Sequence, residues 1–289
     1  MFIVIGLVVV MVCVFGGFVL AGGKFGIIIK ALPTELLMIF GAATGAFLMG
    51  NGGTVIKSAL GGLMRAFKGA KWKKQDYQDV LCLMFLLVKT IRTKGIVAVE
   101  AHIENPQESK IFQHFERISA DHHVVEFICD YLRMMTMNFE DPHQVENAME
   151  QDLERHHAEE HDAAHALQNM ADGLPAIGIV AAVLGIVKTM GSINEPTDVL
   201  GKMVGGALVG TFLGIFLSYT MVGPIAARLN QIMAEDAKLM EIIKVVLVAH
   251  LHGNAPQISV EIGRRNVAST MQPTFSELEE AIAEIPPDL

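Results

Sequence analysis

Charge is missing from four long stretches of this 289-residue chain: residues 1–23, 36–56, 173–187 and 203–227. The composition is 52% hydrophobic and the mean hydropathy is +0.42, which is more apolar than an ordinary water-soluble domain. A bilayer core of about 30 Å requires about 20 apolar residues in a helix. Four membrane spans are therefore predicted, the third reaching this length if Lys188 extends its amine to the interface.

Other absences exclude whole classes of protein. The first stretch has no basic residues before its long apolar run, so it is predicted to be a retained span and not a secretory signal. Only three cysteines occur, Cys13, Cys82 and Cys129, far apart, which excludes a disulfide framework. We find no nucleophile–base pair, phosphate-binding loop or metal motif, so we predict neither an enzyme nor a cofactor. The net charge of −9 argues against nucleic acid as a partner.

The basic residues that are present set the predicted topology. Six of them follow the second span with no acid between them: Lys57, Arg65, Lys68, Lys71, Lys73 and Lys74. Cytoplasmic flanks of membrane spans collect lysine and arginine. The segment after span two is therefore expected to be cytoplasmic, which places both termini in the cytoplasm and leaves two short outer loops.

The expected fold is an all-α integral membrane protein with four transmembrane helices, a large helical cytoplasmic loop and cytoplasmic C-terminal helices. The expected transmembrane helices are residues 1–22, 34–56, 174–193 and 203–225, with a cytoplasmic domain at 57–172 and C-terminal helices at 226–289. Within the cytoplasmic parts, Gly95 is expected to end one helix. Residues 143–171 are predicted to form a charged helix, and Ser276 with Glu279 a capping box.

Small residues are concentrated in the third and fourth spans. The relevant glycines are Gly178, Gly185, Gly206, Gly210 and Gly214, spaced so that several share one helix face. Membrane helices associate by close packing because lipid offers no hydrophobic drive between them. Two interpretations remain open: the glycines pack helices within this chain, or they reserve a face for other helices.

Acidic side chains are missing from the deep parts of the spans. Glu35 is expected at the outer edge of span two, and Lys188 near the outer end of span three. Intramembrane carboxylates mark proton and sodium paths, so either this chain is not an ion path or a partner supplies the carboxylate. Thr211 lies mid-span, where its hydroxyl can serve such a path or bond to its own helix carbonyl.

Two prolines are expected at the same inner membrane level. Pro175 suits the first turn of the third span, whereas Pro224 falls where a helix is expected to continue and would bend it like a hinge. Arg92 lies in the last turn before Gly95, where a cation complements the helix dipole.

At these positions the sequence resembles a known family. PAIGIVAAVLGIV and VGTFLGIFLSYTMVGPIA, with the loop IRTKGIVAVEAHIENPQESKIF and the later HGNAPQISVEIGRR, resemble the MotA family of flagellar stator subunits, part of the MotA/TolQ/ExbB superfamily. The resemblance implies a proton-conducting unit in the bacterial inner membrane that converts proton flow into torque. It implies about five copies of this chain around a MotB-like single-span partner that carries the intramembrane aspartate.

The resemblance also implies roles for single residues. Arg92 and Glu100 match loop charges that contact the FliG-like rotor switch protein. Pro175 and Pro224 match the prolines that couple protonation to loop movement, and Thr211 matches a hydroxyl near the partner aspartate. Ala182 stands where sodium-driven relatives carry threonine, and because a methyl group cannot coordinate sodium, protons are favoured as the coupling ion.

Several alternatives remain open from the sequence. They are an ExbB/TolQ-like energiser of outer-membrane transport, a sodium-driven stator and a non-conducting scaffold. The histidines in ERHHAEEHDAAH, which are His156, His157, His161 and His165, include i,i+4 pairs able to hold zinc or nickel. They form no closed ligand set, so no metal is predicted, although metal binding by this region stays open.

Overall fold

The computed structural model describes residues 2–286, which are helical with no strand among them. The chain divides into two compact units by its internal contacts. We call Met1–Gly69 with Glu159–Ile232 the spanning unit, and Ala70–Ala158 with Met233–Leu289 the globular unit. The predicted all-α class is confirmed.

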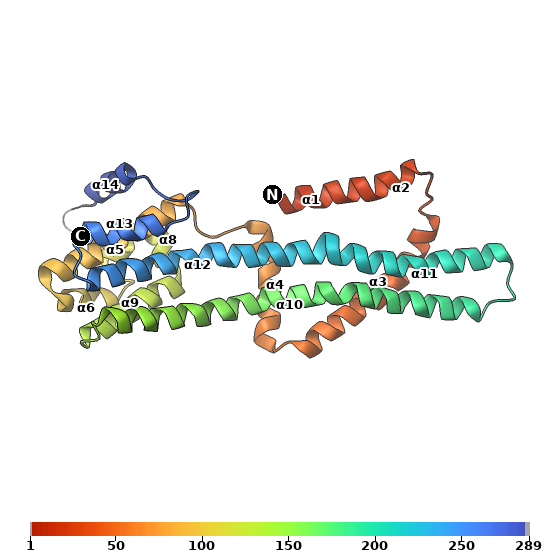
Figure 1. The fold of residues 1–289 in the computed structure, drawn as a ribbon, viewed down its shortest axis with the longest axis horizontal. Helices are drawn as coiled ribbons and strands as arrows, with labels where there is room; N and C mark the ends of the chain where they lie inside the picture. Colours follow the sequence, from red (N-terminus) through yellow and green to blue (C-terminus); the bar gives the residue numbers. More distant parts are fainter. Residues whose placement is uncertain (1, 287–289) are drawn as a thin grey trace. The chain divides into compact units, whose positions relative to one another are not determined.

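Four helical stretches are long and apolar enough to cross a membrane: Phe2–Leu20, Gly26–Gly50, Pro142–Met190 and Thr197–Leu251. The first contains α1 (Phe2–Met11), a π-helical turn (Val12–Gly16) and α2 (Gly17–Leu20); the next two are α3 and α10. The last contains α11 (Thr197–Leu217), a π-helical turn (Ser218–Val222) and α12 (Gly223–Leu251) (Figure 1). The number of predicted spans is confirmed.

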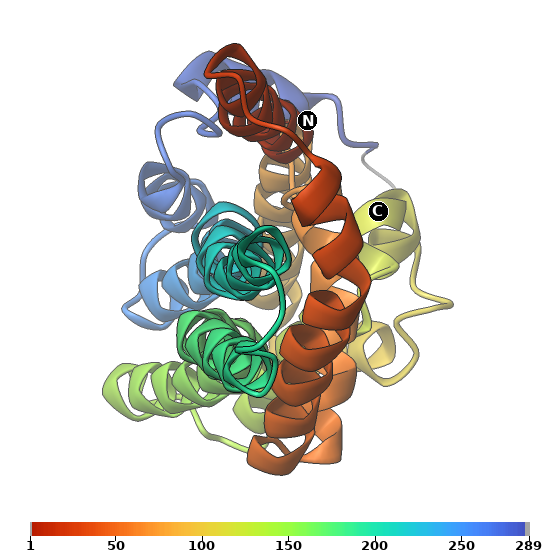
Figure 2. The same ribbon diagram turned by 90° about the vertical axis from the view of Figure 1, so that its right-hand side faces the viewer.

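The core of the spanning unit lies where α3, α10 and α11 meet. Ile39 of α3, Leu174 of α10 and Leu213 of α11 are buried there in one cluster, and Figures 1 and 2 show the three helices lying close together. The N-terminal stretch contacts α11 through Phe15, whose ring centroid is 5.5 Å from that of Phe216. The outward faces of these helices are apolar, as lipid requires.

The second span differs from its predicted limits of 34–56. It begins at Gly26 and ends at Gly50, and the backbone of Asn51 is extended. Pro33 lies inside the helix and removes only one backbone donor. Glu35 is therefore inside the helix, about 14 Å along its axis from Gly26 at 1.5 Å per residue, and its place relative to the membrane edge stays a prediction.

The long helices also cross the predicted domain limits. The charged segment 143–171 and the span 174–193 are one continuous helix, α10, and α12 likewise belongs partly to each unit. Helix α4 (Gly53–Lys68), expected in the cytoplasmic domain, belongs to the spanning unit. There a Cβ placed on Gly62 would lie 2.6 Å from a methyl group of Leu229.

The globular unit is built around α5 (Lys74–Lys94), whose apolar residues are buried on all sides. The unit continues with a 3₁₀ turn (Ile96–Val99), α6 (Glu100–Glu104), α7 (Lys110–His114), α8 (Glu116–Ser119), α9 (His122–Thr136), α13 (Pro256–Asn266) and α14 (Phe275–Ala283). Gly95 ends α5 as predicted, with a φ of 85° that favours glycine. The predicted capping box at Ser276 is wrong, because Thr274 and Glu277 cap α14 reciprocally.

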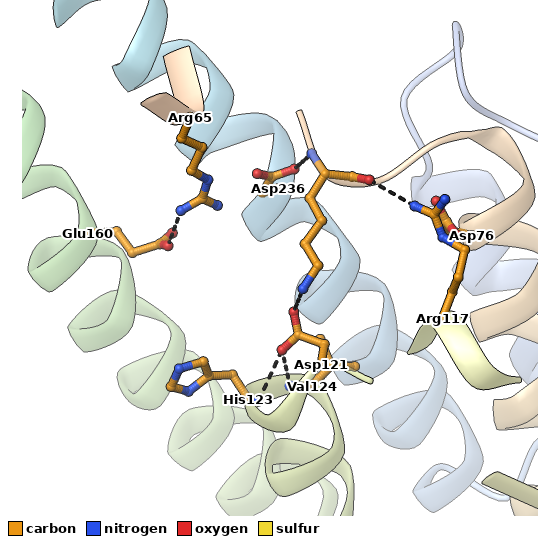
Figure 3. Close-up of polar contacts among 9 residues, drawn as sticks. Arg65, Asp76, Arg117, Asp121, His123, Val124, Glu160 and Asp236 are labelled. Carbon is orange, nitrogen blue, oxygen red and sulfur yellow. Dashed lines mark hydrogen bonds and ion pairs between the residues drawn. The ribbon is translucent and has the colours of Figure 1, made fainter. Parts of the chain in front are cut away.

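Lys71 connects three parts of the globular unit. Its backbone N–H donates to Asp236 of α12 at 2.7 Å, its ammonium pairs with Asp121, and its carbonyl accepts from Arg117 at 3.1 Å (Figure 3). Arg117 also pairs with the buried Asp76 at 2.7 Å. In the spanning unit, Figure 3 shows a separate pair from Arg65 of α4 to Glu160 of α10. Within the globular unit, the contacts of Lys71 and Arg117 fix the start of α5 against α9 and α12.

Asp121 makes the stability of the globular unit depend on pH. It caps α9 by accepting from the backbone of His123 and Val124 at 3.0 and 3.2 Å. Burial alone would raise the pKa of Asp121, but these bonds and the Lys71 ammonium outweigh it and lower the pKa. The stabilisation is therefore complete above about pH 4, the value of an unfolded aspartate, and is lost as the pH falls through the lowered pKa.

We expect Asp121→Asn to remove the Lys71 ion pair and weaken this acid dependence. Because asparagine caps a helix as well as aspartate does, the free energy of unfolding at neutral pH should fall only by the contribution of the ion pair, about 0–1 kcal/mol. Thermal unfolding of the detergent-solubilised chain from neutral to acidic pH measures both effects. An unchanged acid profile in the variant would contradict this role of Asp121.

Candidate functional site

Helices α10 and α11 are in backbone contact. A Cβ on Gly178 would lie 2.9 Å from the Cα of Gly214, and a Cβ on Gly214 would lie 2.7 Å from the carbonyl oxygen of Leu174. Real Cβ atoms do not approach other atoms so closely, so only glycine fits at both positions. This contact is the close packing that small residues permit in membranes.

The remaining glycines of the predicted set differ in their surroundings. A Cβ on Gly185 would lie 2.6 Å from that of Ala207, and one on Gly210 would collide with Glu35. Gly206 meets only a methyl group, that of Ala31, at 3.9 Å. Apart from Gly206, these glycines serve packing within this chain, which supports the first of the two interpretations.

The two predicted ion-path residues lie in the same helix pair. Ala182 is 7% exposed and is packed inside the bundle of the single chain. Thr211 is half-buried, and in the described part of the chain its hydroxyl makes no hydrogen bond. Thr189 and Thr220, by contrast, donate to their own helix at 2.9 and 2.6 Å. The hydroxyl of Thr211 is thus not used by its own helix.

One face of α10 remains uncovered. Ile179, Val183 and Ile186 recur at helical spacing and are 54%, 52% and 45% exposed. A face of this kind can contact lipid or an apolar helix of another chain. The glycines therefore position α10 inside the chain, while larger side chains form its outer surface.

The two predicted hinge prolines lie in two neighbouring long helices, Pro175 in α10 and Pro224 in α12. Pro175 lies inside α10, so the expectation that it begins a helix is wrong, and it deprives the carbonyl of Ala171 of its usual donor. Pro224 directly follows the π-helical turn Ser218–Val222 and Gly223. A Cβ on Gly223 would lie 3.9 Å from that of Ala171. Both weakened helix segments thus lie close together.

The predicted rotor-contact residues are in the globular unit. Arg92 is exposed in the last turn of α5 and Glu100 is exposed in the first turn of α6. The turn between them is anchored by Val99, which is fully buried. Burial, together with the charge of Arg92, lowers the pKa of the neighbouring His250. Arg92 and Glu100 therefore present opposite charges on either side of a turn whose Val99 is buried in the core.

The histidine-rich segment makes other contacts. His161 hydrogen-bonds the side chain of Asn230, and the rings of His123 and His156 lie 5.5 Å apart. Within residues 2–286, no three His, Cys, Asp or Glu side chains gather as a metal would require. The described cysteines are all free.

Sequence reasoning missed the burial of Glu35. Its side chain is only 5% exposed, Oε2 has no hydrogen-bond partner among the described residues, and it contacts Gly210 and lines a cavity. The available signal was a single acid inside a long apolar helix. That signal was missed because the start of the helix was placed after Pro33.

Comparisons with known proteins agree with this arrangement. The Motility protein A N-terminal model matches residues 4–95, and the MotA/TolQ/ExbB proton channel family model matches residues 119–242. Motility protein A of Escherichia coli K12 is 42% identical over 98% of this chain and 95% of its own length. Chemotaxis protein LafT of Vibrio parahaemolyticus is 35% identical over 97% of this chain and 98% of its own length.

Solved structures show the same fold. The MotAB structure of C. jejuni superposes with a TM-score of 0.73 at 18% identity, covering 92% of this chain and 95% of its own chain. The flagellar MotAB stator complex of Bacillus subtilis gives 0.64 at 23% identity, covering 89% and 92%. With relatives this similar over nearly its whole length, the chain belongs to the motility protein A family.

Proposed function

We propose that this chain is the membrane subunit of a flagellar stator that converts proton flow into torque on the rotor. The observation that carries the proposal is its 42% identity to motility protein A over 98% of the chain. Family membership makes it a subunit of a membrane channel and not an enzyme. The proposed location is the bacterial inner membrane, with both termini in the cytoplasm because of the basic segment after span two.

The proposed assembly contains a MotB-like single-span partner and about five copies of this chain. The apolar face of α10 that carries Ile179 and Val183 offers the partner helix an exposed contact surface. Thr211, whose hydroxyl its own helix does not use, supports a position beside the partner's aspartate. The partner would thus supply the carboxylate at the centre of the ion path.

Protons are the proposed coupling ion, with sodium as the alternative. Ala182 offers a methyl group where a sodium site needs an oxygen ligand. Neutralising the partner's aspartate removes the cost of burying its charge and so shifts its helix contacts. Each charge crossing the membrane provides about 2.3 kcal/mol per 100 mV, enough to shift a two-state contact.

The proposed hinge is the pair of segments at Pro175 and Pro224. Each proline removes a helix hydrogen bond, and the π-helical turn before Pro224 adds a second irregularity. Bending at these places requires less rearrangement than bending a regular helix. Movement there would be transmitted to Arg92 and Glu100, which we propose contact a FliG-like rotor switch protein.

Swimming of a strain that lacks every stator tests the proposal. We expect the wild-type chain with its partner to restore swimming in sodium-free medium, and Arg92→Glu to impair it strongly because like charges would then face the rotor. Lys110→Glu, a charge reversal at another exposed position of the globular unit, is the control and should swim normally. A chain that never restores swimming would contradict the stator function and favour an ExbB/TolQ-like energiser.

A further inference from the structure

A cavity of about 610 Å³ lies among α3, α10 and α11 of the spanning unit. Its wall includes Glu35, Thr189 and Gly206, one residue from each helix. The hydroxyl of Thr189 donates to its own helix at 2.9 Å. Glu35 is thus the one acidic side chain among the described residues that line this space.

Glu35 is buried without compensation. It is 5% exposed, and its Oε2 contacts the backbone position of Gly210 and has no hydrogen-bond partner in the described chain. A carboxylate without a partner is costly in an apolar membrane bundle, whereas the neutral acid is tolerated better. This packing therefore favours a proton on Glu35. Gly210 directly precedes Thr211, so Glu35 lies beside the helix segment assigned to the ion path.

The cavity also carries positive charge. Four lysines line it: Lys24, Lys30, Lys188 and Lys202. Lys202 is paired with Asp198 at 2.5 Å, while none of the four is paired with Glu35 in the described structure. Ammonium groups repel metal cations. The lysines thus favour a proton over a metal ion as the cation that Glu35 binds.

We propose that Glu35 is a proton-binding group of this chain, exchanging protons between water in the cavity and the partner's carboxylate. The Glu35 carboxylate takes a proton from hydronium and leaves a water molecule. The acid then gives that proton, through water, to the partner's ionised aspartate, which restores the Glu35 carboxylate. This inference rests on the proposed stator function and assigns it a second titratable site.

The test compares Glu35→Gln with Glu35→Asp in a strain whose motility depends on this chain. Swimming speed and proton entry into the cytoplasm are followed between mildly acidic and mildly alkaline external pH. We expect Glu35→Gln to lower both several-fold and to flatten the pH dependence, because an amide cannot exchange a proton. Glu35→Asp should recover part of the activity. Glu195→Gln makes the same change at an exposed position between α10 and α11 and should behave as wild type.

The outcomes separate this inference from the stator function. If the wild-type chain restores swimming and Glu35→Gln swims with the same speed and pH profile, only the role of Glu35 is overturned. If the wild-type chain never restores swimming, the stator function itself is overturned. If Glu35→Gln does not reach the membrane, hydrophobic carbodiimide labelling of the wild-type complex replaces it. Mass spectrometry should find the adduct on Glu35, more at acidic pH, and absence of an adduct there would overturn the proposal.

Discussion

Replacing Gly214 by valine is expected to separate α10 from α11 and abolish function. The new Cβ would stand 2.7 Å from the carbonyl oxygen of Leu174 and 2.8 Å from the Cα of Gly178. Both neighbours are backbone atoms, so no side-chain rotation relieves the collision. Overpacking a core costs about 1–3 kcal/mol when side chains can adjust, and we expect at least the upper end here.

Gly201→Val is the matched control on the same helix, since Gly201 is exposed and a Cβ there would meet no atom within 4 Å. Membrane levels, thermal unfolding in detergent and swimming are measured for both variants. We expect a large fall in all of them for Gly214→Val and almost none for Gly201→Val. Normal stability and swimming of Gly214→Val would show that the two helices can separate at this level without loss.

Replacing Arg264 by alanine is expected to destabilise the globular unit strongly. The guanidinium is buried, donates to both carboxylate oxygens of Glu261 at 2.6 Å, and donates to the carbonyl of Pro273 at 2.8 Å. Breaking a buried ion pair by removing one partner costs about 3–5 kcal/mol. Because Glu261 is partly exposed, we expect about 2–4 kcal/mol and loosening of the segment before α14.

Arg265 provides a control on the same helix, since it has the same side chain but is exposed. Urea unfolding and limited proteolysis of the full chain compare the two alanine variants. Arg264→Ala should unfold at lower urea and be cut near Pro273, while Arg265→Ala should match wild type. Equal behaviour of both variants would mean that the Arg264 contacts contribute no stability.

Some features were predictable because they depend on local chemistry. The four apolar stretches predicted four spanning helices, since a bilayer leaves few other ways to hydrogen-bond the polar groups of the backbone. Gly95 predicted the end of α5, because its φ of 85° is a conformation that other residues avoid. Arg92 lies in the last turn of α5, as predicted, and both Arg92 and Glu100 are exposed, while their rotor contact stays a prediction.

Other features depended on neighbours distant in sequence. Pro175 looked like a helix start, but α10 continues through it because residues on both sides pack against other helices. Thr274, and not Ser276, caps α14, a difference of one half turn that local preference does not resolve. The burial of Glu35 likewise depends on α11, where Gly210 leaves room for its carboxyl group.

The sequence by itself determined the class of the protein, its spans and its family, because hydropathy, charge asymmetry and motif identity are properties of short segments. Only the tertiary structure decided which glycines meet backbone and which acid is buried. Gly206 and Gly210 look alike in sequence, yet a Cβ on Gly206 would only touch the methyl group of Ala31, whereas one on Gly210 would collide with the carboxyl group of Glu35. The physical reason is that close approach depends on how helices α3, α10 and α11 are rotated against one another, which no single segment encodes.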